Sequence, residues 1–141
     1  MQYRKAAVSK PPRIVNDTNI WLSALYFAGN EAKIVHQIEE GIITSVTSDF
    51  ILQELKEKMI MKFETPFFAA NGTVAYIQSI SELVTVKGQD FKLRDKADNQ
   101  VLETAVVGKC HWLITGDKDL LSAKKYQDIK IVNAVQFLDN Y

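Results

Sequence analysis

The residues of this chain that could do chemistry are carboxylates, and they stand in four short acidic signatures. These are Asp17-Thr18-Asn19, the lone Glu54, Asp98-Asn99, and Thr115-Gly116-Asp117-Lys118-Asp119. Hard cations such as Mg²⁺ and Mn²⁺ prefer oxygen ligands, and such ions support phosphoryl transfer when carboxylates hold them beside a substrate phosphate. The four signatures therefore predict a divalent metal site, provided that the fold brings them together.

Other side chains offer fewer candidates for catalysis or metal binding. Cys110 is the only cysteine, and the two histidines, His36 and His111, lack metal-ligand spacings such as HxxxH or CxxC, so we expect structural roles for both. The sequence has no glycine-rich phosphate loop and no serine nucleophile elbow. We interpret the following aromatic residues as core rather than as a stacking platform: Trp21, Tyr26, Phe27, Phe63, Phe67 and Phe68.

The composition is that of an ordinary folded protein. Of 141 residues, 47% are hydrophobic and 24% charged, which predicts a single domain over residues 1–141. A lone cysteine cannot form an internal disulfide and fits a reducing, cytoplasmic setting. No run approaches the ~18 apolar residues of a membrane span, and no apolar segment follows the basic N-terminus as in a secretory signal. We expect a soluble cytoplasmic protein.

The formal net charge is zero, but it is unevenly distributed. Residues 1–13 contain four bases and no acid, so residues 14–141 carry 13 bases against 17 acids, a net charge of −4. We interpret residues 1–12 as a flexible basic leader that ends at Pro11-Pro12. The overall charge does not indicate a nucleic-acid partner. An RNA substrate would need metal ions and local basic residues to offset its phosphates.

Predicted strands and helices alternate along the sequence. The β-prone runs are 13–16, 42–47, 83–86, 112–115 and 129–132, and segments with helical spacing of apolar residues lie between them. This alternation predicts an α/β fold, a three-layer α/β/α sandwich around a mainly parallel five-stranded sheet. In such folds the functional crevice lies outside the carboxyl ends of the strands.

Two of the acids stand where this crevice is expected. Asp17 and Asp117 each follow a predicted strand directly, and Asp119 is two residues further on. Asp17 could instead serve only as a helix N-cap, and Asp117 could belong only to a Gly-Asp turn. Taken together with Asp98, three acids at strand-to-helix junctions of one sheet favour a metal site.

The other two acids stand in predicted helices. Asp98 shares a face with Val101 and Leu102, so its carboxylate needs a partner, either the amides of the first helical turn or a metal ion. Glu54 lies in a helix that begins near residue 48. Helical spacing does not distinguish Glu54 from Glu57 as a ligand, and both could be solvated surface residues.

In their order and spacing, these stretches resemble the PIN domain family, in particular the VapC-like ribonuclease toxins of bacterial and archaeal toxin/antitoxin pairs. The resemblance runs from about Arg13 to Leu138. It rests on IVNDTNIWLSAL, SDFILQELKEKM and LRDKADNQVLETAVVGKCHWLITGDKDLL. One departure is Asn16, where the family usually has a hydrophobic residue before the first Asp. A second is the absence of proline from residues 94–98.

The resemblance implies a metal-dependent endoribonuclease that cleaves RNA with Mg²⁺ or Mn²⁺. It selects Glu54 over Glu57, and it implies a small antitoxin partner and a homodimer. The implied catalytic and metal-binding acids are Asp17, Glu54, Asp98 and Asp117, with Asp119 as a further metal ligand or a neighbour of the ligands. The implied supporting polar residues are Asn19, Asn99 and Thr115.

Two other functions compete with this interpretation. A phosphohydrolase of the haloacid dehalogenase type also combines an early Asp motif with a late Gly-Asp motif, but it needs Asp two positions after the nucleophile, where this chain has Asn19. The chain could also be a PIN scaffold with weak or no catalysis that binds RNA or protein. Metal binding without RNA cleavage would favour the scaffold.

Overall fold

The structure is a computed structural model, and it describes residues 10–141. The predicted basic leader falls largely outside the described residues, which exclude residues 1–9. None of the helices in the described part of the chain is long and apolar enough to cross a membrane.

Residues 10–141 form one sheet of six strands in the order β3-β2-β1-β4-β6-β5. The strand pairs are parallel except for β5 against β6, which is antiparallel. The prediction of an α/β fold with a mainly parallel sheet is therefore confirmed, and the two-residue β5 is an addition to the five predicted strands. The strands are β1 (Arg13–Asn16), β2 (Thr44–Ser48), β3 (Ser81–Val84), β4 (Trp112–Ile114), β5 (Lys125–Tyr126) and β6 (Ile129–Val132).

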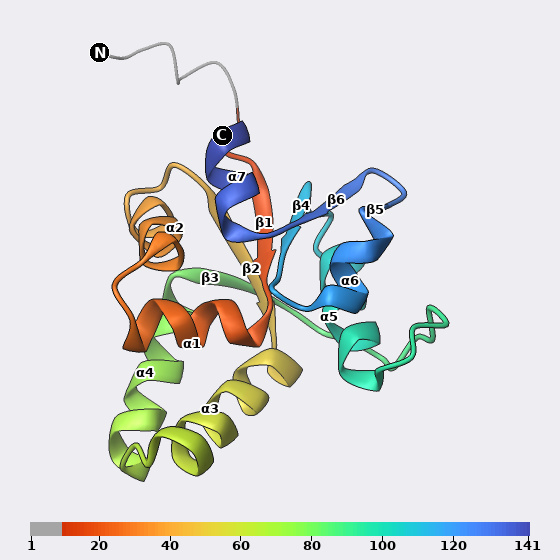
Figure 1. The fold of residues 1–141 in the computed structure, drawn as a ribbon. Coiled ribbons are helices and arrows are strands. Elements are labelled where there is room, and N and C mark those ends of the chain that lie inside the picture. The colour runs from red at the N-terminus through yellow and green to blue at the C-terminus, as the bar shows by residue number, and fades with distance from the viewer. Residues whose placement is uncertain (1–9) are drawn as a thin grey trace, which may run out of the picture.

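Helices cover both faces of the sheet (Figure 1). α5 and α6 lie on one face, and α1, α2 and α7 on the other, with α3 and α4 packed beside α1 below the sheet in this view (Figure 1). The helices are α1 (Thr18–Tyr26), α2 (Asn30–Glu39), α3 (Asp49–Phe63), α4 (Phe67–Ser79), α5 (Lys96–Val107), α6 (Lys118–Ala123) and α7 (Ala134–Asn140).

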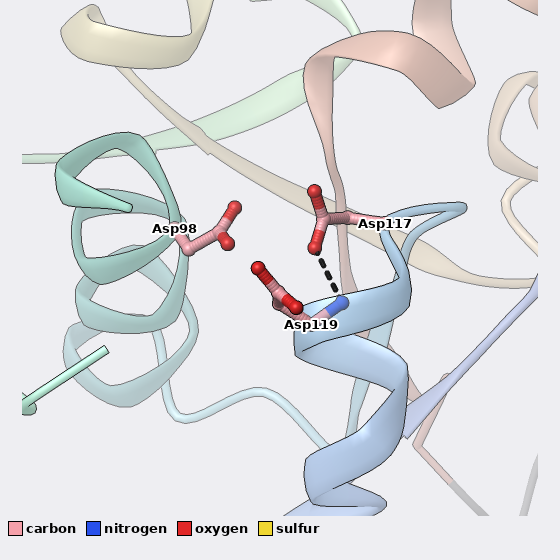
Figure 2. A group of neighbouring side chains, drawn as sticks. All are labelled: Asp98, Asp117 and Asp119. Carbon is pink, nitrogen blue, oxygen red and sulfur yellow. Dashed lines mark hydrogen bonds between the residues drawn. The ribbon is translucent and has the colours of Figure 1, made fainter. Parts of the chain in front are cut away.

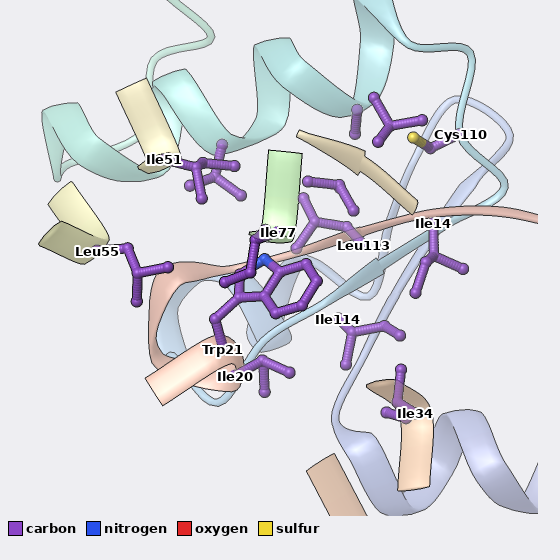
Figure 3. Close-up of a cluster of buried hydrophobic side chains, with 14 of the residues drawn as sticks. Ile14, Ile20, Trp21, Ile34, Ile51, Leu55, Ile77, Cys110, Leu113 and Ile114 are labelled. Carbon is purple, nitrogen blue, oxygen red and sulfur yellow. The ribbon is translucent and has the colours of Figure 1, made fainter. Parts of the chain in front are cut away.

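The central strands are buried on both faces because helices cover both. Ile14, Val15, Leu113 and Ile114 are each 0% exposed, which is why β1 and β4 are short apolar runs without a polar alternation. Figure 3 shows several of these side chains packed together with Trp21 from α1.

The aromatic residues are divided between core and surface. Trp21 is buried as predicted, but Phe27, Phe67 and Phe68 are more than half exposed and Phe63 is 36% exposed, so the prediction of an aromatic core is wrong for these four. Phe67 and Phe68 begin α4, where the first turn projects from the domain and little of the chain covers it. Tyr26 stacks on Phe63 with ring centroids 4.0 Å apart.

Side-chain caps mark the helix starts that follow strands. Asp17 caps α1 by accepting a hydrogen bond from the Thr18 backbone N–H, and Ser48 caps α3 by accepting one from Ile51. For α4 the sequence predicts Thr65 as the N-cap and Pro66 as the first helical residue, but Pro66 precedes the helix and Thr65 does not cap it.

α5 begins two residues before Asp98, where the sequence predicts the helix to start. Its cap is Asp95, whose carboxylate accepts a hydrogen bond from the Ala97 backbone N–H, and the helix starts at Lys96. Asp98 lies inside the first turn, but among the described residues no amide of that turn donates to its buried Oδ2, so the alternative partner for this oxygen is not provided.

The register of β1 and β4 sets up the site. Asn16 pairs with Ile114 at the carboxyl ends of these neighbouring parallel strands. Asp17 continues this pairing, because its backbone N–H donates to the Ile114 carbonyl at 2.9 Å. The residues that follow the two strands therefore emerge side by side.

Candidate metal centre

A hydrogen-bonded chain links the acids that follow β1 and β4. The Thr115 hydroxyl donates to Asp17 Oδ2 at 2.8 Å and accepts from the Asp117 backbone N–H at 2.9 Å. Thr115 is 0% exposed, so this link is shielded from water. One side chain thus sets the position of Asp17 and of the backbone at Asp117.

Asp117 and Asp119 are arranged by the start of α6. Asp117 Oδ1 accepts hydrogen bonds from the backbone N–H groups of Asp119, at 2.8 Å, and Leu120, at 3.1 Å. These bonds hold the carboxylate at the helix start (Figure 2). Asp117 therefore does fill a structural role at a turn and helix start, while its carboxylate also faces the neighbouring acids.

Three acids form the tightest group in the described part of the chain. Asp98, Asp117 and Asp119 each offer a carboxylate oxygen, and these three atoms lie within 4.8 Å of one another. Figure 2 shows Asp98 projecting from α5 toward Asp117, just before α6, and Asp119, in its first turn. Asp119 belongs to this group, whereas Asp17 and Glu54 lie outside it among the described residues.

Asp98 has the least favourable surroundings for a negative charge. Its side chain is buried, and Oδ2 has no hydrogen-bond partner among the described residues. Burial, followed by repulsion from Asp117, Asp95, Asp17 and Asp119, raises the pKa of Asp98 to about 7. A buried, unpartnered carboxylate facing two further acids is the environment that a bound cation would relieve.

Asp17 has its own set of neighbours. Burial raises its pKa most, and the charge of Glu54 adds to that rise, whereas the hydrogen bonds from Thr115 and the Thr18 backbone and the charge of Lys58 lower it. Asp17 also contributes to the repulsion felt by Asp98. It is therefore electrostatically part of the acidic site even though it is not in the tightest group.

Glu54 is placed near Asp17 by α3. One of its oxygens accepts a hydrogen bond from the Thr18 hydroxyl at the start of α1. Glu54 is thus on the site side of α3, whereas Glu57 is exposed and bonds to Gln53 of its own helix. Asn19 is exposed and accepts a hydrogen bond from Lys58 at 3.4 Å, and the charge of Lys58 in turn lowers the pKa of Asp17.

Asn99 binds the loop before α5, and its supporting role beside the acids stays a prediction. Its side-chain oxygen accepts from the backbone of Phe91, at 2.9 Å, and its amide donates to the Leu93 carbonyl at 3.2 Å. The two histidines are remote from these contacts. His111 accepts a hydrogen bond from the Arg13 backbone, and His36 lies beside Glu39.

Sequence reasoning missed Arg94 as a site residue. Its guanidinium donates to Asp119 Oδ2 at 2.7 Å, although the two residues are 25 positions apart. No periodic pattern marks Arg94, because it lies in an irregular loop. The only signal in the sequence is a basic residue close before the helix that carries Asp98.

The donor set fits a hard divalent cation. The three grouped acids supply oxygen ligands only, from two elements, and Mg²⁺ is characteristically held by one or two carboxylates together with water and phosphate oxygens. The unpartnered Asp98 oxygen is the particular observation that a cation would satisfy. His36, His111 and Cys110 contribute nothing to this set.

The fold and the acids define a class, the α/β domains with carboxylates grouped at the carboxyl ends of a mainly parallel sheet. The sequence model of the PIN domain matches residues 13–119, and the chain belongs to the PIN domain family, whose members are generally nucleases. The haloacid dehalogenase alternative gains no support from this match. No curated protein matches the chain in sequence.

Two solved structures share the fold. One is the crystal structure of PAE2754 from Pyrobaculum aerophilum; the similarity covers 92% of this chain and 88% of that one, with a TM-score of 0.59 and 13% identity. The second is the PIN domain endonuclease Utp24, with coverage of 88% and 86%, a TM-score of 0.52 and 21% identity. At these identities the similarity establishes the fold alone.

Proposed function

We propose that this PIN domain is a metal-dependent endoribonuclease and the toxin of a toxin/antitoxin pair. The observation that carries the proposal is the grouping of Asp98, Asp117 and Asp119, with the buried oxygen of Asp98 left without a partner among the described residues. Asp17 and Glu54 complete the acidic surroundings. The proposed metal is Mg²⁺ or Mn²⁺, and the substrate is an RNA phosphodiester.

The side chains have different roles in the proposed reaction. Asp98, Asp117 and Asp119 would hold the ion, with Asp17 and Glu54 beside it. A divalent ion bound there would lower the pKa of a bound water and stabilise charge on phosphate oxygens. The residues of the chain prepare this chemistry: Thr115 orients Asp17, and the start of α6 orients Asp117. Hydrolysis then forms one P–O bond to water, breaks one P–O bond to ribose and delivers a proton to the leaving oxygen.

The antitoxin part of the proposal is supported by the contact between Arg94 and Asp119. This contact shows that a guanidinium fits against the acids at 2.7 Å. A small antitoxin could inhibit the enzyme by inserting a similar basic side chain, since charge-assisted pairs with carboxylates are strong and specific. Homodimerisation is a further part of the proposal. Co-expression with a protein from an adjacent small reading frame, followed by light scattering, tests both partners.

The deciding experiment compares RNA cleavage by wild type, Asp117→Asn and Asp139→Asn, with Mn²⁺ and with chelator. Asp139 is exposed on α7 and provides the same change of charge away from the site. We expect wild type and Asp139→Asn to cut a mixed RNA pool only with Mn²⁺. Asp117→Asn should lose about 100-fold or more in rate, equivalent to about 2.7 kcal/mol of barrier.

Equal cleavage by wild type and Asp117→Asn would overturn the metal-site assignment. Mn²⁺ binding by calorimetry without cleavage of any RNA in the pool would instead favour the catalytically weak PIN scaffold. This outcome would separate a failure of catalysis from a failure of metal binding.

A further inference from the structure

The loop that joins β3 to α5, residues 85–95, is held against α5 by two side chains of that helix. Glu103 is 2% exposed, and its carboxylate accepts backbone hydrogen bonds from Lys87 at 2.7 Å and from Gly88 and Gln89 at 2.9 Å. Burial raises the pKa of Glu103, but these backbone donors together hold that pKa below its usual value. One turn earlier, Asn99 binds the second half of the loop.

These anchors create a cavity between the 85–95 loop and the start of α5. Its volume is about 350 Å³, within the range of roughly 300–1,000 Å³ that is usual for ligand sites. Arg94 and Lys96 supply two cations to its wall and Asp90 one carboxylate, while Gln89 and Gln100 supply amides and Leu93 an apolar surface. Cations with amides and a small apolar surface suit the phosphate and base of one nucleotide.

Arg94 connects this cavity to the acids. It lines the cavity, and its guanidinium also donates to Asp119 of the acidic group. The Arg94 side chain is 83% exposed, so the guanidinium can change partners without disturbing the core. A cation bound to Asp119 would compete with Arg94 for that carboxylate and so free the guanidinium for another anion.

We propose that the cavity between the 85–95 loop and α5 binds one nucleotide of a single-stranded RNA beside the scissile phosphate, with Arg94 as a phosphate ligand that metal binding releases from Asp119. The proposal rests on the nuclease function proposed above and adds a substrate site to it. Glu103 and Asn99 act as positioning residues, since they hold the loop that presents Arg94.

The test is binding of a fluorescein-labelled single-stranded RNA, measured by anisotropy in Ca²⁺ and in chelator, with the length of the RNA checked on a gel. We expect Arg94→Gln to weaken binding in Ca²⁺ by roughly 3- to 10-fold. The slope of log Kd against log salt should fall by about 0.7, the value for one phosphate contact on a single strand. In chelator the difference between wild type and Arg94→Gln should be smaller, because Asp119 then retains Arg94.

Lys33→Gln is the matched control. Lys33 is exposed on α2, on the other face of the sheet, and loses the same charge. It should bind RNA as wild type does. Glu103→Gln should weaken binding in the same direction as Arg94→Gln, and the double variant should show less than the sum of the two effects because both act through one loop.

Arg94→Gln protein with the affinity and salt slope of wild type, in a preparation that still cleaves RNA, would overturn the nucleotide site and leave the nuclease intact. Wild-type protein that neither cleaves nor binds RNA in any metal would overturn both proposals. Circular dichroism will show whether Glu103→Gln folds. If it does not, the comparison of RNA binding by Arg94→Gln and Lys33→Gln tests the nucleotide site by itself.

Discussion

At the scale of single residues, the acids differ in how well the fold satisfies them. Asp117 is held by backbone N–H groups and Asp17 by Thr115, whereas Asp98 has an oxygen with no partner among the described residues. The repulsion at Asp98 comes from four other acids. The chain therefore holds a charge arrangement that opposes folding when no cation is present.

Replacing Asp98 tests this electrostatic strain. Because the pKa of Asp98 is about 7, its carboxylate is mostly charged at pH 8; Asp98→Asn removes this buried, repelled charge, so in chelator at pH 8 we expect the free energy of unfolding to rise by about 1–3 kcal/mol. Denaturant unfolding followed by circular dichroism measures the change. Asp139→Asn, exposed on α7, should stay within about 0.5 kcal/mol of wild type. An Asp98→Asn protein less stable than wild type in chelator would show that repulsion does not dominate at this position.

Asn16 is a second polar residue without partners. It is 0% exposed at the end of β1, and neither polar atom of its amide has a hydrogen-bond partner among the described residues. The departure from the hydrophobic residue expected there thus places an amide directly beside Asp17. Its backbone position is ordinary, because Asn16 keeps its register against Ile114.

At the scale of elements, α5 both supplies Asp98 and must pack closely on the sheet. Gly108 ends this helix directly over β2. A Cβ at Gly108 would lie 2.5 Å from Val46 Cγ1 and 3.0 Å from the Thr104 carbonyl oxygen. The residue has an ordinary φ of −77°, so close approach rather than backbone conformation requires glycine here.

Gly108→Ala should therefore lower the free energy of unfolding by about 1–3 kcal/mol through overpacking. Thermal or denaturant unfolding measures this. In the double variant with Val46→Ala the loss should be less than the sum of the single losses, because the clashing methyl is gone. Gly72→Ala in α4 is the control, since a Cβ there meets nothing within 4 Å and should stabilise the protein by about 0.5–1 kcal/mol. Additive losses in the double variant would contradict the contact with Val46.

At the scale of the whole molecule, the acidic site joins elements that are distant in the sequence. α5 and α6 contribute the grouped acids, and both pack on the sheet whose central strands place Asp17 and Thr115. An ion bound there would stabilise these elements together rather than one loop.

Mn²⁺ should consequently raise the melting temperature of the domain in a single cooperative transition. At a concentration of 100 times the Kd, the gain is about 2.7 kcal/mol. Calorimetry with wild type, Asp117→Asn and Asp139→Asn measures it. The exposed control should respond as wild type does, and Asp117→Asn should respond less. Equal shifts in all three proteins would place the ion elsewhere.

The amino-acid sequence by itself determined the alternation of strands and helices and the chemistry of the acids. The β-prone runs 13–16 and 112–115 predict two strands that place Asp17 and Asp117 after their ends, and the structure ends the second strand one residue earlier, at Ile114. The sequence pattern could not distinguish Glu54 from Glu57 as a site residue, and it did not locate the start of α5. Both depend on contacts with other elements. The family resemblance selected Glu54, and the structure places it beside Thr18.

Only the tertiary structure decided which acids meet. The strand order places β1 beside β4, and α5 then crosses the same sheet so that Asp98 faces α6. It also decided that Asp119 joins the group and that Arg94 reaches it. Periodicity encodes which face of an element is apolar, whereas distances between elements arise from packing among residues that are far apart in the chain. The four acidic signatures could therefore be identified from the sequence, whereas the close grouping of Asp98, Asp117 and Asp119 could not.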